Sequence, residues 1–175
     1  SSGKTYKVGD YYNENGKEGV VFEVSADGHH GKIVDLKLSD ARCWACTNTK
    51  ILIGADSKTD GKYNMTKVAS IANWSDNYHA FEWCKSRGTG WYMPSIEELK
   101  VLLLNANVRN AVNATLAAKG GKKIESHHCY WSSTESNQSG LIGTWYVDMT
   151  NGKANSSCSN IHDSICCGGY LLLYI

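Results

Sequence analysis

One helix is specified clearly near the middle of the chain. Residues 90–99 read Gly-Trp-Tyr-Met-Pro-Ser-Ile-Glu-Glu-Leu, and Ser95 and Glu98 within them have the spacing of a capping box. In a capping box the serine side chain accepts from the glutamate amide, while the glutamate side chain reaches back to the serine amide. Apolar residues follow at helical spacing, namely Leu99, Leu102, Leu103 and Ala106. The pattern predicts a helix that starts at Ser95 and buries one face.

The residues before this helix have the turn chemistry of β-hairpins. Between residues 6 and 38, β-branched runs are separated by Asn-Gly and Asp-Gly pairs. These pairs favour the tight turns that connect antiparallel strands, so we predict an N-terminal β-meander. Residues 42–62 are rich in turn formers and lack apolar periodicity, which predicts an ordered loop.

Further helices and strands complete an α+β order. Helical spacing recurs in residues 65–72, 78–84 and 109–119, which predicts three more helices. Residues 143–149 read as a strand of a C-terminal β-hairpin, and residues 170–175 as a buried closing strand. The predicted fold class is α+β, with the helices grouped centrally between the meander and the hairpin.

Length and charge limit the classes of protein that fit. A chain of 175 residues supports one core, so we predict a single domain over residues 1–175. The 18 basic and 17 acidic side chains give a net charge of +1 without a basic run, so no nucleic-acid partner is expected. No apolar stretch approaches the roughly 18 residues of a membrane span. We expect no direct membrane insertion, and any leader or anchor to lie outside this chain.

The cysteines give a weak signal for metal or redox chemistry. Cys43 and Cys46 have Cys-x-x-Cys spacing, but a zinc site needs two further ligands and a redox motif should open a helix after a buried strand. We therefore expect both to pack as small apolar side chains beside Trp44. One or two disulfide bonds in the chain remain possible. We expect no metal, no cofactor, and no shared scaffold among Cys158, Cys166 and Cys167.

No catalytic constellation is evident. The chain has no Gly-x-Ser-x-Gly nucleophile motif, and the paired histidines at 29–30 and 127–128 would point to opposite faces of a strand. Glu97 and Glu98 suit the positive end of a helix dipole. We expect all six histidines to be surface or hydrogen-bonded residues, and the protein not to be an enzyme.

The C-terminal stretch has an unusual composition. Residues 155–169 lack Lys, Glu, Gln, Met and Trp, although these types make up 33 of the 153 residues before Ala154. None of the five types has a codon ending in C, whereas every type present in the stretch has one. A patterned scaffold therefore ends in an unpatterned segment.

Three segments together resemble a known family. Residues 90–99, the Tyr-Trp-Ser-Ser-Thr-Glu of residues 130–135, and Thr-Trp-Tyr-Val at 144–147 followed by Asn151-Gly152 resemble the C-type lectin-like domain of the formylglycine-generating-enzyme type. They are most similar to its use in variable proteins of diversity-generating retroelements. Weaker matches extend the resemblance over residues 30–175. The Glu-Pro-Asn or Gln-Pro-Asp signature of calcium-dependent sugar binding is absent, since Pro94 is the only proline.

The resemblance implies a binding function for the C-terminal region. In such proteins, reverse transcription from a template repeat randomises adenines, and the altered codons encode an exposed ligand-binding surface. This implies a variable region at about residues 136–169 that binds an unknown protein or surface ligand, on an extracellular protein at a cell surface or on a phage virion. The implied ligand-binding residues are Ser139, Gly140, Leu141, Ile142, Asp148, Thr150, Ser156, Ser157, Cys158, Ser159, Asn160, Ile161, His162, Asp163 and Ser164.

Two alternatives remain open, and one geometric expectation tests the reading. The alternatives are an oxidoreductase like the formylglycine-generating enzyme, suggested by Cys166-Cys167, and a structural pilus or tail module. If the variable-surface reading holds, one exposed face should carry Leu141, Ile142, Asp148, Ser157, Ser159, Ile161 and Asp163. Trp131, Trp145 and Leu172 should be buried behind that face.

Overall fold

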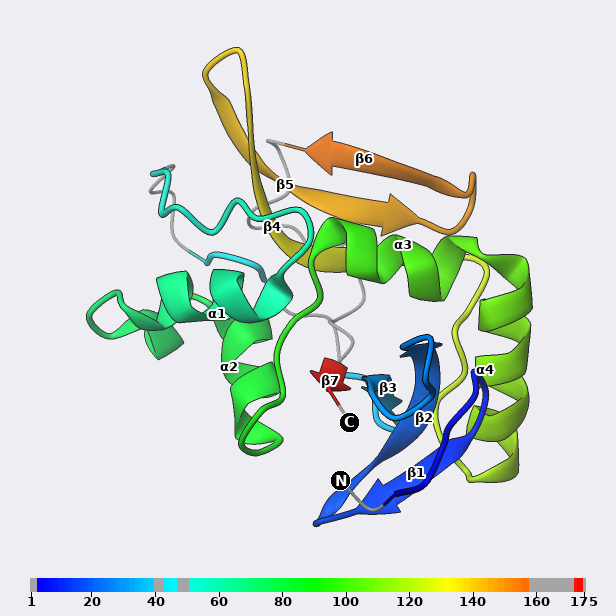
Figure 1. The fold of residues 1–175 in the computed structure, drawn as a ribbon. Coiled ribbons are helices and arrows are strands. Elements are labelled where there is room, and N and C mark those ends of the chain that lie inside the picture. The colour runs from blue at the N-terminus through cyan, green and yellow to red at the C-terminus, as the bar shows by residue number, and fades with distance from the viewer. Residues whose placement is uncertain (1–2, 40–42, 47–50, 158–171, 175) are drawn as a thin grey trace.

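The computed structural model describes residues 3–39, 43–46, 51–157 and 172–174, which form an α+β fold with two antiparallel sheets. The first sheet contains β1 (Tyr11–Glu14), β2 (Lys17–Val24), β3 (Gly31–Asp35) and β7 (Leu172–Tyr174), in the order β1-β2-β3-β7. The predicted N-terminal meander is confirmed. The closing strand pairs with β3 through Leu172–Tyr174, so the two ends of the chain share one sheet (Figure 1).

The second sheet is larger than the predicted hairpin. It contains β4 (Cys129–Gln138), β5 (Leu141–Asp148) and β6 (Lys153–Ser157), in that order. The extra strand β4 was not predicted, because its Ser-Ser-Thr-Glu-Ser run has no alternating apolar pattern. These polar side chains are buried and hydrogen-bonded instead: the Ile96 amide donates to Thr134 Oγ1 at 2.9 Å, and Asn64 Nδ2 to Ser133 Oγ at 3.0 Å.

The helices lie between and beside the two sheets. Their bounds are α1 (Gly61–Ala69), the 3-10 turn η1 (Trp74–Asp76), α2 (His79–Ser86), α3 (Ile96–Leu104) and α4 (Ala106–Ala118). Helix α3 contacts β2 on one side and β4, β5 and β6 on the other, so it separates the sheets (Figure 1). Its Ile96, Leu99, Leu102 and Leu103 are buried in the core. Helix α3 thus forms the base on which the second sheet rests.

The start of α3 confirms the capping box. The Glu98 amide donates to Ser95 Oγ at 3.4 Å, and the Ser95 amide donates to Glu98 Oε1 at 3.1 Å. The expected apolar position Ala106 is wrong, because α3 ends at Leu104 and Ala106 is exposed at the start of α4. Asn105 causes this break, since its side chain accepts from the amides of the following helix.

Ser95→Ala should lower the free energy of unfolding by about 1 kcal/mol, because it removes the acceptor for one amide of the first helical turn. Urea denaturation followed by circular dichroism would measure this. Ser86→Ala, an exposed change at the end of α2, is the matched control and should have little effect. Equal stability of the two variants would contradict a stabilising cap.

Cys43 and Cys46 are joined by a disulfide bond with a Cα–Cα distance of 5.5 Å. The sequence left the pairing of these cysteines open, and the structure shows that they are bonded to each other. The two residues between them allow the loop to bring the sulfurs together, but Cys-x-x-Cys spacing by itself does not show that the bond forms. Trp44 between them is buried, as expected.

Candidate functional site

The outer end of the β4–β5 hairpin extends away from the helices (Figure 1). Ser139 and Gly140 form its turn, and both have left-handed backbone conformations, with φ of 54° and 83°. This is the conformation of the tight turns that favour Asn, Asp and Gly, so Ser139 tolerates a restricted set of residues. Leu141 follows the turn with 60% of its surface exposed. An exposed apolar side chain on a projecting hairpin is a candidate contact for a partner.

The predicted binding residues of β5 do not share one face. Consecutive residues of a regularly paired strand point to opposite faces, and Leu141 and Ile142 pair regularly with Gln138 and Asn137. The expectation that Leu141 and Ile142 lie on the same face is therefore wrong. Leu141 shares its face with Trp145, whereas Ile142 shares the other with Asp148. The predicted residues of β5 therefore belong to two separate candidate surfaces, one on each face of the sheet.

Trp131 and Trp145 differ in burial. Trp131 is fully buried, as expected, and packs edge-to-face on Tyr146 with ring centroids 5.9 Å apart. Trp145 is only half-buried, so its predicted burial is wrong. The Nζ atom of Lys58 lies 5.1 Å from the centroid of the Trp145 ring. Trp145 is therefore a partly exposed aromatic on the same face of β5 as Leu141, about 13 Å further along the strand, and it pairs with Ser156 of β6.

The remaining predicted residues lie at the ends of β5 and β6, in the turn after β5, or outside the described ranges. Asp148 is half-buried, and its Oδ1 accepts from the amide of exposed Thr150 at 2.9 Å. The hydroxyl of Thr150 also donates to this carboxylate, which lowers the pKa of Asp148. Ser157 pairs through its backbone with Thr144. The residues outside the described ranges are Cys158, Ser159, Asn160, Ile161, His162, Asp163 and Ser164.

A hollow of about 420 Å³ lies between the second sheet and the loop before α1. Leu52, Asp56 and Lys58 line it from the loop, and Gln138 and Trp145 line it from the sheet. Its volume falls within the usual range for small-ligand sites. A larger hollow of about 700 Å³ lies between α4 and residues 123–127, beyond the end of β5 that is distant from the hairpin tip.

The loop side of the 420 Å³ hollow was not predicted from the sequence. Ile51 and Leu52 are 53% and 50% exposed, although large apolar side chains are usually buried. The apolar run Ile51-Leu52-Ile53 inside a turn-rich polar loop was the available signal. It could not be assigned to the binding surface, because the loop and the hairpin are about 80 residues apart in sequence.

Glu135 connects the loop to the sheet at this hollow. Its carboxylate accepts from the Ile53 amide at 2.8 Å and the Gly54 amide at 3.1 Å, and the residue is 5% exposed. Burial raises the pKa of Glu135, the two amides oppose this effect, and the negative charge of Asp56 adds to it. The buried carboxylate thus helps to hold the loop wall of the hollow, together with bonds from the Glu135 amide to the Ala55 oxygen at 2.7 Å and from Thr134 Oγ1 to the Ser57 oxygen at 2.9 Å.

Glu135→Gln should change the pH dependence of stability. Because the pKa of Glu135 is raised above its ordinary value of 4.5, the folded protein holds this proton more tightly than the unfolded chain does. The contribution of Glu135 to stability is therefore largest below that value and decreases as pH rises through the raised pKa. Relative to the parent chain, Glu135→Gln should become more stable as pH rises above the ordinary value of 4.5, as measured by urea denaturation.

Glu125→Gln is the matched control for this measurement. The exposed carboxylate of Glu125 has a lowered pKa, mainly because Lys122 donates a hydrogen bond to it. The sign is therefore opposite: the contribution of Glu125 is lost as pH falls, so Glu125→Gln should lose relative stability as pH rises. The same slope for both variants would show that the burial of Glu135 does not control the effect.

Comparison with known proteins shows the fold but not a family. No protein-family model matches the chain, and no curated protein matches it. Among solved structures, the chain is similar to a fimbrial protein from Bacteroides ovatus ATCC 8483, with 17% identity and a TM-score of 0.62. The alignment covers 97% of this chain and 48% of the fimbrial protein, so the chain spans about half of its length. The likeness establishes a shared fold.

Within the described ranges, no helix has the length and apolar character needed to traverse a membrane.

Proposed function

We propose that the chain is a non-enzymatic ligand-binding module of a cell-surface protein, and that its second sheet carries the binding surface. The observation that carries the proposal is Leu141, an apolar side chain 60% exposed at the tip of a hairpin whose base is fixed by fully buried Trp131. Half-buried Trp145 and the adjacent hollow extend this surface. Likeness to a fimbrial protein supports placement at a cell surface.

The finer part of the proposal is that a retroelement diversifies this surface on a C-type lectin-like domain. Its support is the restricted composition of residues 155–169, together with the three family-like segments of the sequence. Those segments contribute the capped start of α3 and the core of the second sheet. Substitutions at exposed positions usually change stability by less than about 0.5 kcal/mol, so such a scaffold tolerates variation at its surface.

A structural fimbrial module is the second candidate function. The shared fold with a fimbrial protein supports it. A subunit that only assembles with its neighbours would need no variable surface. In that case the exposed side chains of residues 51–52 and of the hairpin tip would contact the next subunit. The two candidates therefore differ in how residues 136–169 vary between strains.

Sequencing the same locus in sister isolates separates the two candidates. Diversification predicts substitutions concentrated in codons 136–169, mostly at adenines of the parent codons, with residues 90–135 nearly unchanged. The control is the rate of silent change across codons 3–135. Uniform drift along the locus would contradict diversification and favour the structural module.

A further inference from the structure

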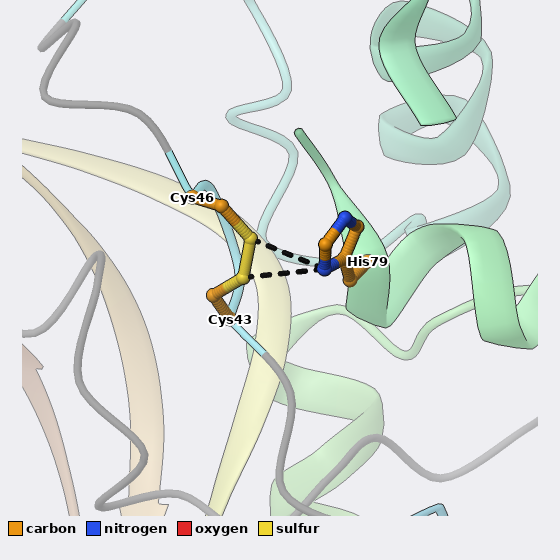
Figure 2. Close-up of side chains that lie close together, drawn as sticks. All are labelled: Cys43, Cys46 and His79. Carbon is orange, nitrogen blue, oxygen red and sulfur yellow. Dashed lines mark hydrogen bonds between the residues drawn. A yellow bond between two sulfur atoms is a disulfide. The ribbon is translucent and has the colours of Figure 1, made fainter. Parts of the chain in front are cut away.

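The disulfide of Cys43 and Cys46 faces a histidine from a distant part of the chain. His79 Nδ1 lies 3.6 Å from Cys43 Sγ and 3.4 Å from Cys46 Sγ (Figure 2). The Cys-x-x-Cys spacing is only a weak signal for a metal site, because further ligands at matching spacing are not evident in the sequence. The fold supplies one at the start of α2, and the three ligand atoms lie within 4.8 Å of one another.

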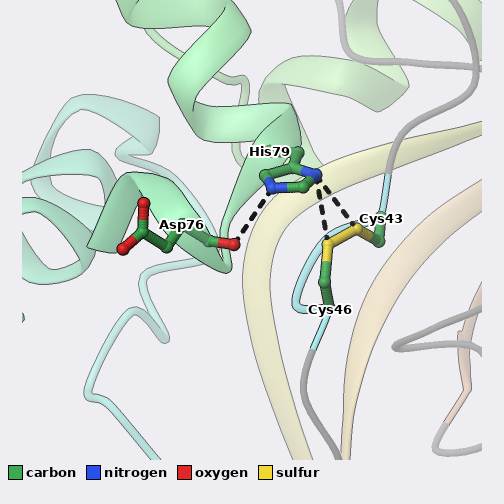
Figure 3. The surroundings of a disulfide bond; sticks show 4 residues. All are labelled: Cys43, Cys46, Asp76 and His79. Atoms are coloured by element: carbon green, nitrogen blue, oxygen red, sulfur yellow. Dashed lines mark hydrogen bonds between the residues drawn. A yellow bond between two sulfur atoms is a disulfide. The ribbon is translucent and has the colours of Figure 1, made fainter. Parts of the chain in front are cut away.

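The orientation of His79 is set by its other ring nitrogen. His79 Nε2 lies 3.0 Å from the backbone oxygen of Asp76 (Figure 3). A carbonyl oxygen can only accept, so Nε2 carries the proton and Nδ1 of the neutral ring directs its lone pair at the sulfurs. Disulfide sulfurs have no proton to donate to this lone pair. Reduced thiols can donate to it, and a metal ion between the three atoms can bind it.

The loop that carries the cysteines is held in place without the disulfide. Trp44 packs edge-to-face on Tyr78 and on Phe81, with ring centroids 5.9 and 5.3 Å apart, and its Nε1 donates to the Ser132 oxygen at 2.9 Å. These contacts fix the centre of the Cys-x-x-Cys segment against α2 and β4. The loop should therefore keep its position after the disulfide is reduced.

Backbone hydrogen bonds flank the histidine on both sides. The Cys46 amide donates to the Asn77 oxygen at 2.8 Å, and the Ala80 amide donates to the Cys43 oxygen at 3.2 Å. Both cysteines are thus tied to the residues around His79. The three side chains are arranged in advance, which lowers the conformational cost of binding an ion.

We propose that reduced Cys43 and Cys46, together with His79 Nδ1, form a binding site for a thiophilic metal ion such as Zn²⁺. Zn–S bonds of about 2.3 Å and Zn–N bonds of about 2.0–2.1 Å in tetrahedral geometry place sulfur and nitrogen about 3.5 Å apart. The observed separations of 3.4 and 3.6 Å are close to this requirement. The two sulfurs, which are bonded to each other in the disulfide, have to move to about 3.8 Å apart to bind one ion. The bond from His79 to a backbone carbonyl is the usual outer-shell support of a metal-binding histidine.

The disulfide is the oxidised, metal-free form of this site. Its reduction to two thiols takes up two electrons from a thiol or phosphine reductant. The two protons come from the thiol groups of a thiol reductant or, with a phosphine, from the water that converts it to the phosphine oxide. Binding of Zn²⁺ then releases both thiol protons, because thiolates are the ligands. Three protein ligands leave a fourth position for water or another donor. The site thereby couples metal binding to the redox state of Cys43 and Cys46.

Titration of the reduced protein with Co²⁺ tests the proposal, because tetrahedral thiolate-bound Co²⁺ absorbs visible and near-ultraviolet light. The full chain carries Cys158→Ser, Cys166→Ser and Cys167→Ser, is reduced with a phosphine, and is titrated without oxygen. We expect binding of one equivalent of Co²⁺, displacement by Zn²⁺, and no such absorption with the oxidised protein. The titration is repeated with the three C-terminal cysteines retained, which should give the same bands from this site.

Three variants test the individual ligands. Cys43→Ser and Cys46→Ser should abolish the absorption. His79→Ala keeps both thiols and should weaken binding by at least about tenfold, the effect that even outer-shell partners commonly have. His29→Ala, in the N-terminal meander, is the matched control and should bind as the parent does.

Four outcomes would overturn the proposal. Three of them are no thiolate absorption in the reduced parent, absorption that survives in Cys46→Ser, and unchanged affinity in a His79→Ala protein whose circular dichroism is native. Absorption in the oxidised protein would place the site elsewhere and would also overturn it. If a serine variant fails to fold, the comparison of His79→Ala with His29→Ala decides the result.

Discussion

Glu98→Ala is expected to lower the free energy of unfolding by about 3–5 kcal/mol, the usual cost of removing one partner of a buried ion pair. Glu98 is 4% exposed, and its carboxylate lies 3.1 Å from Lys32 Nζ, whose side chain is 9% exposed. It also accepts from the Gly61 amide at 2.8 Å and from the Tyr92 hydroxyl at 2.7 Å. Removal of the carboxylate therefore affects α1, α3 and the first sheet together.

Gly61 shows how closely these elements approach. A Cβ atom at this position would lie 2.3 Å from the Met93 oxygen and 2.7 Å from the Ser95 nitrogen. Only glycine allows the start of α1 to come this near, and that approach brings its amide to Glu98. Glu98, which completes the capping box of α3, thereby also accepts a hydrogen bond from the first amide of α1.

Urea denaturation followed by tryptophan fluorescence would measure the effect of Glu98→Ala. Glu97→Ala is the matched control, because Glu97 is exposed and its bond to Lys100 is a surface ion pair, so the change should stay within about 1 kcal/mol. Lys32→Met combined with Glu98→Ala should recover part of the loss, since no buried charge is then left unpaired. A loss for Glu98→Ala no larger than for Glu97→Ala would show that the buried pair does not hold the elements together.

Trp131→Ala should cost about 3–5 kcal/mol, whereas Trp145→Ala should cost less than about 2 kcal/mol. Trp131 is fully buried and packs on Tyr146, so truncation leaves a cavity under the second sheet. Trp145 is half-buried, and its main polar neighbour is the solvent-exposed Lys58. The two tryptophans, similar in sequence context, should thus separate into one that stabilises the sheet and one that is available for binding.

The two variants are matched controls for each other, since both remove one indole from the same sheet. Urea denaturation at one pH would give both free energies, and circular dichroism would confirm that Trp145→Ala keeps the fold. Equal losses would place Trp145 in the core. The proposal of a binding surface beside Leu141 would then lose its aromatic component.

Local features were predictable because their partners lie within a few residues. The Ser95–Glu98 capping box, the turns of the N-terminal meander and the helical spacing of the leucines after Ser95 all depend on contacts within one turn of chain. The structure confirms each of them. The end of α3 was placed too late, because Asn105 can cap the next helix as readily as it can continue the first.

The candidate surface was predictable only in part. The strand periodicity of residues 143–149 indicated β5, yet it also required Leu141 and Ile142 to face opposite ways, contrary to a single shared face. The loop wall of the hollow was missed. Its contact with Glu135 joins residues that no periodicity relates.

The sequence alone determined the α+β class, the capped central helix, the N-terminal meander and a C-terminal segment of restricted composition. Only the tertiary structure decided that β4 buries a polar run, that Glu98 binds Lys32, and that His79 meets Cys43 and Cys46. The physical reason is the range of the interactions. Hydrogen bonds and side-chain contacts within a turn follow from residue order, whereas buried polar partners far apart in sequence are selected by the packing of whole elements.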